Sequence, residues 1–213
     1  SGLDRHEVLR AASMATGGTA TKILDELVES GFVSSAPLLW RKQREARYRL
    51  SDEYSLFWLT FVEVHRAAGD GGWLKKRASP RFRAWSGPAF ESICLRHVAA
   101  LKRALGIAGV ETEEGPWVYR PASADDQGAQ IDLVIDRADQ SINLCEMKFA
   151  ESEFVIDKAY ARELEQKRDV FRRVTGTRKS VFLTLVTTHG LRSNDHAQRL
   201  GVEAVTMDAL FAS

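Results

Sequence analysis

Three charged residues interrupt two apolar stretches near the middle of the chain, within residues 130–149. Asp132 lies in the first stretch, and Glu146 and Lys148 lie in the second. If the stretches are strands joined by a turn centred on Asp139, Asp132 stands opposite Glu146, with Cβ atoms roughly 5 Å apart. Carboxylates that close repel unless a cation lies between them. Because strand side chains alternate, Lys148 projects from the same face as Glu146. The spacing therefore predicts a divalent-cation site with an ammonium at its edge.

The sequence around this hairpin predicts the elements that must position these side chains. Helices are expected over residues 89–105 and 157–173, strands over 117–119, 131–135, 142–149, 181–187 and 202–207, and a last helical turn over 208–211. Glu91 lies early in the first helix, where the helix dipole alone also explains a carboxylate. Lys167 shares a face with Tyr160 on the second helix and adjoins Gln166, although a long lysine stem also snorkels. This order predicts an α/β fold, a sheet flanked by helices.

The first third of the chain predicts a different module. Helical segments over 5–14 and 20–30 precede a short strand signal at 32–33 and an alternating basic segment over 39–50. Helix, turn, helix and a basic ribbon is the layout of a winged helix, which binds DNA through its second helix and wing. The alternative is a packing or protein-interaction module. The second helix carries one Lys against three acidic residues, which suits a phosphate-facing surface poorly.

Basic side chains in two clusters are the candidate DNA contacts. They are Arg41, Lys42, Arg44, Arg47 and Arg49 in the ribbon, and Lys75, Lys76 and Arg77 further along the chain. Between the clusters, residues 52–67 predict an apolar helix whose aromatics belong to a core, and a glycine-rich break follows. The predicted domains are a winged-helix domain with a trailing helix over 1–68, a linker over 69–86 and an α/β domain over 87–213.

Composition sets few limits on function. The chain has 213 residues, is 44% hydrophobic and 28% charged, and carries a formal net charge of +1, so any affinity for nucleic acid depends on local clusters of basic residues. Cys94 and Cys145 have no metal or redox spacing and are expected to be core thiols of a reducing compartment. No stretch reaches transmembrane length and no leader is recognisable, so we expect a cytoplasmic protein without a membrane partner.

Glu91, Asp132 and the Glu146-Met147-Lys148 element resemble the PD-(D/E)xK nuclease superfamily, over roughly residues 87–211. Ile131 stands where the motif carries proline. More narrowly, a winged helix, the segment YRLSDEYSLFWLTFVE, a GPAFE helix and the IDLVID…CEMKF hairpin resemble the C-terminal half of archaeal and bacterial ATPases with a DUF234-type tail. This resemblance implies a restriction-endonuclease-like fold and an upstream ATPase module in a longer parent protein. The sequence has no GxxxxGK[ST] motif, so no ATP site is expected in these residues.

The resemblance implies a Mg²⁺-dependent or Mn²⁺-dependent nuclease that acts on nucleic acid, with DNA favoured. The implied metal ligands are Asp132, Glu146, the Met147 carbonyl and Glu91. Mg²⁺ suits such a set because it prefers oxygen ligands and retains several waters. Lys148 would orient the attacking water and stabilise the developing charge, and Gln166 or Lys167 would contact the phosphate.

Two interpretations from other classes remain open. In the first, a catalytically silent nuclease-like fold and the winged helix form a regulatory module that binds DNA or a protein. Three charges inside an apolar hairpin argue mildly against it, because burying charge is costly. In the second, the chain is a winged-helix transcription regulator with a helper domain. That interpretation leaves the charges of the hairpin unexplained.

Overall fold

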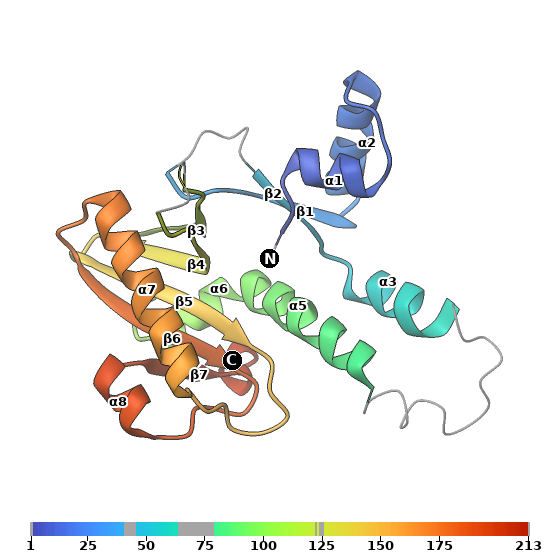
Figure 1. The fold of residues 1–213 in the computed structure, drawn as a ribbon. Helices are drawn as coiled ribbons and strands as arrows, with labels where there is room; N and C mark the ends of the chain where they lie inside the picture. The colour runs from blue at the N-terminus through green and yellow to red at the C-terminus, as the bar shows by residue number, and fades with distance from the viewer. Residues whose placement is uncertain (1, 41–45, 64–78, 122, 124–125, 213) are drawn as a thin grey trace. The chain divides into compact units, whose positions relative to one another are not determined.

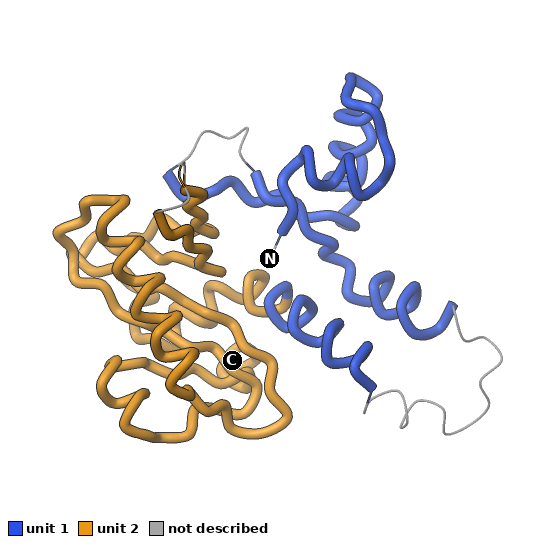
Figure 2. Tube along the Cα trace, viewed as in Figure 1, with its two compact units in different colours: residues 1–92 blue, residues 93–213 orange. Residues whose placement is uncertain are grey.

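The computed structural model describes residues 2–40, 46–63, 79–121, 123 and 126–212 (Figure 1). The chain forms two compact units, Ser1–Ser92 and Ile93–Ser213 (Figure 2). Their boundary falls within a helix, after the end of the linker that the sequence predicts over 69–86. Residues 69–78 of that linker lie outside the described residues, and its last residues are helical. Within the described ranges, no helix has the length and apolarity that a membrane crossing requires.

The first unit begins with two helices and a two-stranded ribbon. The helices are α1 (Arg5–Ala11) and α2 (Gly18–Glu29), and the antiparallel strands are β1 (Val33–Pro37) and β2 (Ala46–Leu50). A capping box starts α1, because the Asp4 side chain accepts from the Glu7 amide while the Glu7 side chain accepts from the Asp4 amide. Leu9, Ala20 and Leu24 form a small buried core between the two helices.

The apolar segment after the ribbon is less buried than the sequence indicates. It forms α3 (Glu53–Phe57) followed by a π-helical stretch, η1 (Trp58–Val62). Phe61 is buried, and its ring lies 5.6 Å from that of Trp85, as expected for a core. Leu59 is 54% exposed and Tyr54 is 68% exposed. The prediction that the aromatics of this segment belong to a core is therefore right for Phe61 and wrong for Tyr54.

The next helix begins earlier than the sequence indicates. We expected it to start at residue 89, but α5 spans Pro80–Arg96 and Pro88 lies inside it. Pro80 occupies its first position, where a missing amide hydrogen costs nothing, and Ser79 caps the turn by accepting from the Phe82 amide at 3.2 Å. The helix expected over 89–105 is also interrupted at His97, and α6 (Val98–Ala104) follows.

The second unit contains a five-stranded mixed sheet flanked by helices, so the predicted α/β class is confirmed. Its strands follow the order β3-β4-β5-β6-β7, with antiparallel pairing from β3 to β5 and parallel pairing from β5 to β7. They are β3 (Thr112–Tyr119), β4 (Ala129–Arg137), β5 (Ser141–Lys148), β6 (Ser180–Thr187) and β7 (Glu203–Thr206). The first of them is longer than the strand expected over 117–119.

Helices cover both faces of this sheet. In Figure 1, α7 (Lys158–Thr175) crosses in front of the sheet and α6 lies behind it. A short helix that the sequence did not indicate, α8 (Asp195–Leu200), precedes β7, and a 3-10 turn (Met207–Leu210) ends the fold. Every residue from Ile142 to Met147 is buried, which explains why β5 reads as an almost continuous apolar stretch.

Candidate active site

The β4–β5 hairpin has the register that the sequence predicts. Leu133 pairs with Cys145, and continuing this register by one residue sets Asp132 opposite Glu146. Asp132 Oδ2 accepts a hydrogen bond of 3.0 Å from the Met147 amide, which fixes this carboxylate against the neighbouring strand. The two carboxylates therefore lie on adjacent strands at one level of the sheet.

Glu146 is a charged residue buried within the second unit. It is 3% exposed, and its Oε2 accepts a hydrogen bond of 2.7 Å from Lys167 Nζ. Its Oε1 is buried and has no hydrogen-bond partner among the described residues. Burial and then repulsion from Asp132 raise the pKa of Glu146 to about 7, while Lys167 and Lys148 oppose the rise. Glu146 is therefore a buried carboxylate whose negative charge the protein neutralises only in part.

Lys167, which the sequence analysis assigned as a possible phosphate contact, instead bonds to Glu146 from α7. Its ammonium also lies 3.0 Å from Glu163 Oε1, one helical turn earlier. Burial opposes the charge of Lys167, but the two glutamates outweigh burial and raise its pKa, so it stays protonated at neutral pH. Glu163 is a site residue that was not predicted, although its i,i+4 spacing from Lys167 is a signal for such a pair in the sequence.

Lys148 lies at the open side of the same site. Its ammonium is 3.9 Å from Glu146 Oε2 and 5.0 Å from the centre of the Tyr160 ring. Its side chain is 32% exposed, so a ligand in solvent can reach it. Gln166 is half-buried on α7, and its predicted contact with phosphate remains a prediction.

The donor set fits a divalent cation in part. The free Oε1 of Glu146 and the Asp132 carboxylate are hard oxygen donors, and such donors suit Mg²⁺. The parts of the chain that the structure describes contain no group of three or more His, Cys, Asp or Glu side chains around a possible metal position. A metal here would depend on two carboxylates, the Met147 carbonyl and water. Ligation by that carbonyl remains a prediction.

Glu91, the other predicted ligand, belongs to the first unit. It is 7% exposed, and its Oε1 lies 2.7 Å from Arg49 Nη1. Arg49, a predicted DNA contact, therefore has a carboxylate partner within its own unit. The participation of Glu91 in the site on the β4–β5 hairpin remains a prediction.

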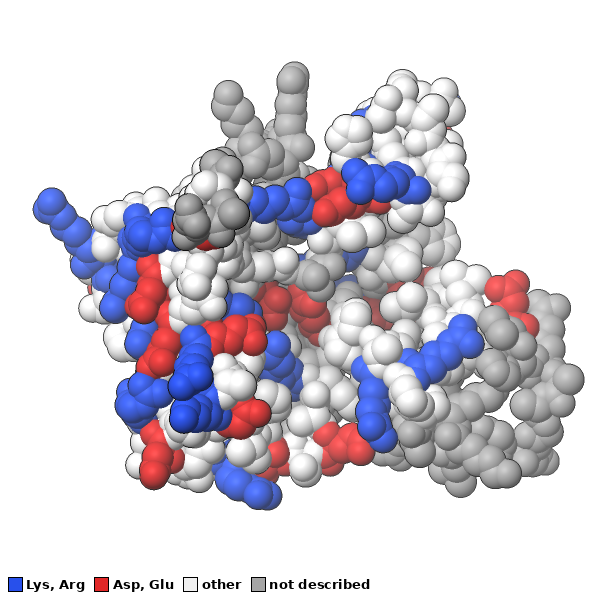
Figure 3. All heavy atoms as spheres, viewed as in Figure 1, with Lys and Arg blue, Asp and Glu red and all other residues white. Residues whose placement is uncertain are grey.

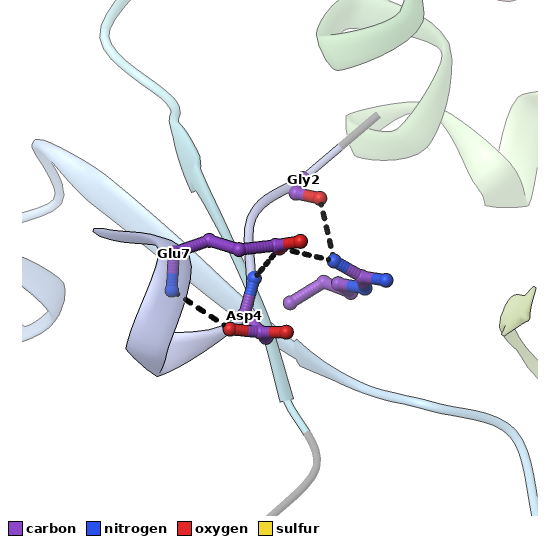
Figure 4. A network of polar contacts seen from close by, with 4 residues as sticks. Gly2, Asp4 and Glu7 are labelled. Atoms are coloured by element: carbon purple, nitrogen blue, oxygen red, sulfur yellow. Dashed lines mark hydrogen bonds and ion pairs between the residues drawn. The ribbon is translucent and has the colours of Figure 1, made fainter. Parts of the chain in front are cut away.

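Arg47 also has protein partners. Its Nη1 donates to the Gly2 carbonyl at 3.1 Å and to Glu7 Oε2 at 2.9 Å, so the guanidinium completes the network around the capping box (Figure 4). It is 7% exposed, less than expected for a side chain on a wing. In this conformation Arg47 serves the fold of the first unit, and its contact with DNA remains a prediction.

The remaining candidate DNA contacts fall outside the described residues. They are Arg41, Lys42, Arg44, Lys75, Lys76 and Arg77. On the face in Figure 3, the described Lys and Arg side chains of the second unit are interspersed with Asp and Glu. That face therefore presents a mixed charge pattern across the described residues.

Comparisons with known proteins give little guidance. No protein-family model matches the chain, and no curated protein matches it. Among solved structures, the chain is similar to a protein described as "Crystal Structure of Protein of Unknown Function AF1548", with 15% sequence identity and a TM-score of 0.40. The match covers 55% of this chain and 64% of the other, so the chain spans less than two thirds of that protein.

Proposed function

We propose that this chain hydrolyses phosphodiester bonds of nucleic acid, with DNA as the favoured substrate, at a site formed by Asp132, Glu146 and Lys148. One observation carries the proposal: Glu146 is buried with one carboxylate oxygen on Lys167 and the other without a partner in the described part of the chain. A buried acceptor left unpaired costs about 1–3 kcal/mol. A cation bound at Oε1 would remove that cost.

The fold is compatible with this function. A three-stranded antiparallel segment continues into two parallel strands, and the charged residues lie at the carboxyl end of β5, where ligands of open α/β sheets bind. We interpret the second unit as restriction-endonuclease-like and the helices and ribbon of the first as a winged helix. An ATPase module upstream in a longer parent protein belongs to the same proposal.

In this mechanism, Asp132 and Glu146 would hold the divalent cation. A bound Mg²⁺ or Mn²⁺ would supply Lewis acidity at the scissile phosphate. Lys148 lies beside Glu146 with its ammonium partly exposed, so it stabilises negative charge that develops on the phosphate. Lys167 stays protonated and holds Glu146 in place through Oε2, so Oε1 would be available to a cation.

A cleavage assay tests the proposal. The protein is incubated with supercoiled DNA, single-stranded DNA and RNA, in Mg²⁺, Mn²⁺ or EDTA, beside Asp132→Asn and Lys148→Ala. We expect metal-dependent cleavage by the wild type and a loss of about 100-fold or more in each variant, as for removal of other groups that stabilise a transition state. Arg199→Ala, which removes an exposed partner of Glu165 on the same unit, is the matched control and should cleave normally. Cleavage that is absent in every metal, or equal in the variants, would refute the proposal.

A non-catalytic function is the second candidate, and a specific observation favours it. Lys167 already provides a cation for Glu146, at 2.7 Å, and the described residues offer only two carboxylates at this site. The chain would then be a regulatory module that binds DNA or a protein. DNA binding by the wild type that survives Asp132→Asn and is never followed by cleavage would favour this candidate over the first.

A further inference from the structure

Tyr160 is a half-buried titratable residue with a buried hydroxyl, and the mechanism above does not use it. It lies in the first turn of α7, where its amide donates to Asp157 Oδ1 at 2.7 Å, and this cap fixes where the helix begins. Glu163 and Lys167 follow at positions i+3 and i+7, so the three side chains share one face of the helix. Because Lys167 bonds to Glu146, that face is directed to the site.

The Tyr160 ring has a neighbour on each of two sides. The Phe154 ring meets it edge-on, with centres 5.5 Å apart and planes at 73°. The Lys148 ammonium lies 5.0 Å from the centre of the Tyr160 ring, within the range of a cation–π interaction. Phe154 therefore packs edge-on against the Tyr160 ring, and the Tyr160 ring contacts the Lys148 ammonium that the mechanism uses.

The Tyr160 hydroxyl has no hydrogen-bond partner among the described residues, although it is buried. Burial, followed by the charges of Glu146, Glu163 and Asp132, raises the pKa of Tyr160 far above its ordinary value. The hydroxyl is therefore protonated at any physiological pH and offers a hydrogen to an acceptor. A non-bridging phosphate oxygen is such an acceptor, and the Lys148 ammonium over the Tyr160 ring would attract the same anion.

We propose that Tyr160 binds a phosphate oxygen of the nucleic-acid substrate through its hydroxyl, while its ring holds Lys148 against that same phosphate. The proposal rests on the phosphodiester hydrolysis proposed above, and it adds the group that recognises the scissile phosphate. A competing explanation is an internal water that bonds the hydroxyl permanently, as waters do in other buried polar sites. Substrate would then leave the hydroxyl unchanged.

Two substitutions separate the two contributions of Tyr160. Tyr160→Phe removes the hydroxyl and keeps the ring, so we expect KM to rise about tenfold with kcat within about twofold, the effect of losing one hydrogen bond to a charged group. Tyr160→Leu also removes the ring, so we expect the same rise in KM and a further fall of about tenfold in kcat as Lys148 loses its position. Tyr119→Phe, which deletes a hydroxyl bonded to Asp126 instead, should change neither constant.

A spectroscopic measurement reports on the ring without depending on activity. In the wild type, the methylene protons beside the Lys148 ammonium lie over an aromatic face and should resonate upfield of those of exposed lysines. The upfield shift should persist in Tyr160→Phe and disappear in Tyr160→Leu. A Lys148 signal at the position of exposed lysines in the wild type would overturn the part assigned to the ring.

Binding of labelled duplex DNA in EDTA separates failure of this proposal from failure of hydrolysis. If the wild type cleaves DNA and Tyr160→Phe has wild-type KM and affinity, the hydroxyl does not bind phosphate and the proposal for Tyr160 is overturned. If the wild type binds DNA without cleaving it, hydrolysis fails, and a tenfold loss of affinity in Tyr160→Phe still supports phosphate binding by Tyr160. If the wild type neither binds nor cleaves nucleic acid, both proposals are overturned.

Discussion

Each unit contains a glutamate paired with a basic side chain, but the two carboxylates differ in whether an oxygen is left without a described partner. In the first unit, Arg47 divides its guanidinium between the Gly2 carbonyl and Glu7, and Glu7 also closes the capping box of α1. In the second unit, Glu146 gives one oxygen to Lys167, and its other oxygen is buried without a partner in the described residues. The first pair joins parts of the fold, whereas the second leaves an acceptor that a ligand can complete.

Removing the Arg47 guanidinium should have the largest effect on stability among the changes predicted here. Arg47→Ala removes one donor from Glu7 Oε2 and one from the Gly2 carbonyl, and we expect the free energy of unfolding of the first unit to fall by about 3 kcal/mol. Urea denaturation measures the loss. Lys22→Ala, which removes an exposed partner of Glu26, is the control and should change stability by less than about 0.5 kcal/mol. A fall as small as that of the control would show that the Arg47 network does not stabilise the fold.

The pair of Glu146 and Lys167 should make the stability of the second unit depend on pH. Its carboxyl has a pKa raised from 4.5 to about 7 in the folded state, so folding favours the protonated form of Glu146. The stabilisation is therefore complete below about pH 4.5 and is lost as pH rises through about 7. The difference between the two pKa values corresponds to about 3 kcal/mol, and Lys167 stays protonated throughout this window.

Glu146→Gln isolates this contribution. The variant keeps the size of the side chain and has no proton to lose, so its stability should lack the fall between about pH 4.5 and 7. Urea denaturation across this range, in metal-free buffer, compares the two proteins. A parallel pH dependence in wild type and variant would assign the fall to other groups and contradict the raised pKa of Glu146.

A divalent cation should stabilise the second unit by a smaller amount. At a concentration about tenfold above its dissociation constant, Mg²⁺ or Mn²⁺ adds about 1.4 kcal/mol to the free energy of unfolding. Thermal melts of the wild type with and without metal measure this gain, and Asp132→Asn should lose most of it. An equal gain in that variant would indicate that the metal binds elsewhere.

The sequence predicted the hairpin well because its signals are local. The two apolar stretches and the turn centred on Asp139 determine the strands and their register, and the register sets Asp132 opposite Glu146. Helical spacing likewise predicted that Lys167 shares a face of its helix with Tyr160. The predicted start of α5 was wrong, because Gly87 and Pro88 resemble a helix start. The Ser79 cap and Pro80, which actually begin the helix, were not recognised.

Contacts between distant segments were beyond the sequence. Arg47 alternates with polar residues in a basic ribbon and therefore looked exposed, but its partners lie about 40 residues earlier in the chain. Whether Glu146 Oε1 has a partner also depends on long-range contacts, because β6 and α7 bring their side chains to the hairpin from later in the chain. Sequence alone therefore predicted that Asp132 lies opposite Glu146, and only the structure indicated which of their atoms remain available.

Binding of Mn²⁺ to the metal-free protein tests most directly whether the free oxygen of Glu146 is a metal ligand. Electron paramagnetic resonance of free Mn²⁺ during a titration gives the stoichiometry and affinity for the wild type, Glu146→Gln and the matched control Glu165→Gln. The control alters a partly exposed pair between α7 and α8. We predict about one bound Mn²⁺ per chain in the wild type and in the control, and an affinity at least about tenfold lower in Glu146→Gln. Equal Mn²⁺ affinity in all three proteins, or no binding to the wild type, would contradict the account.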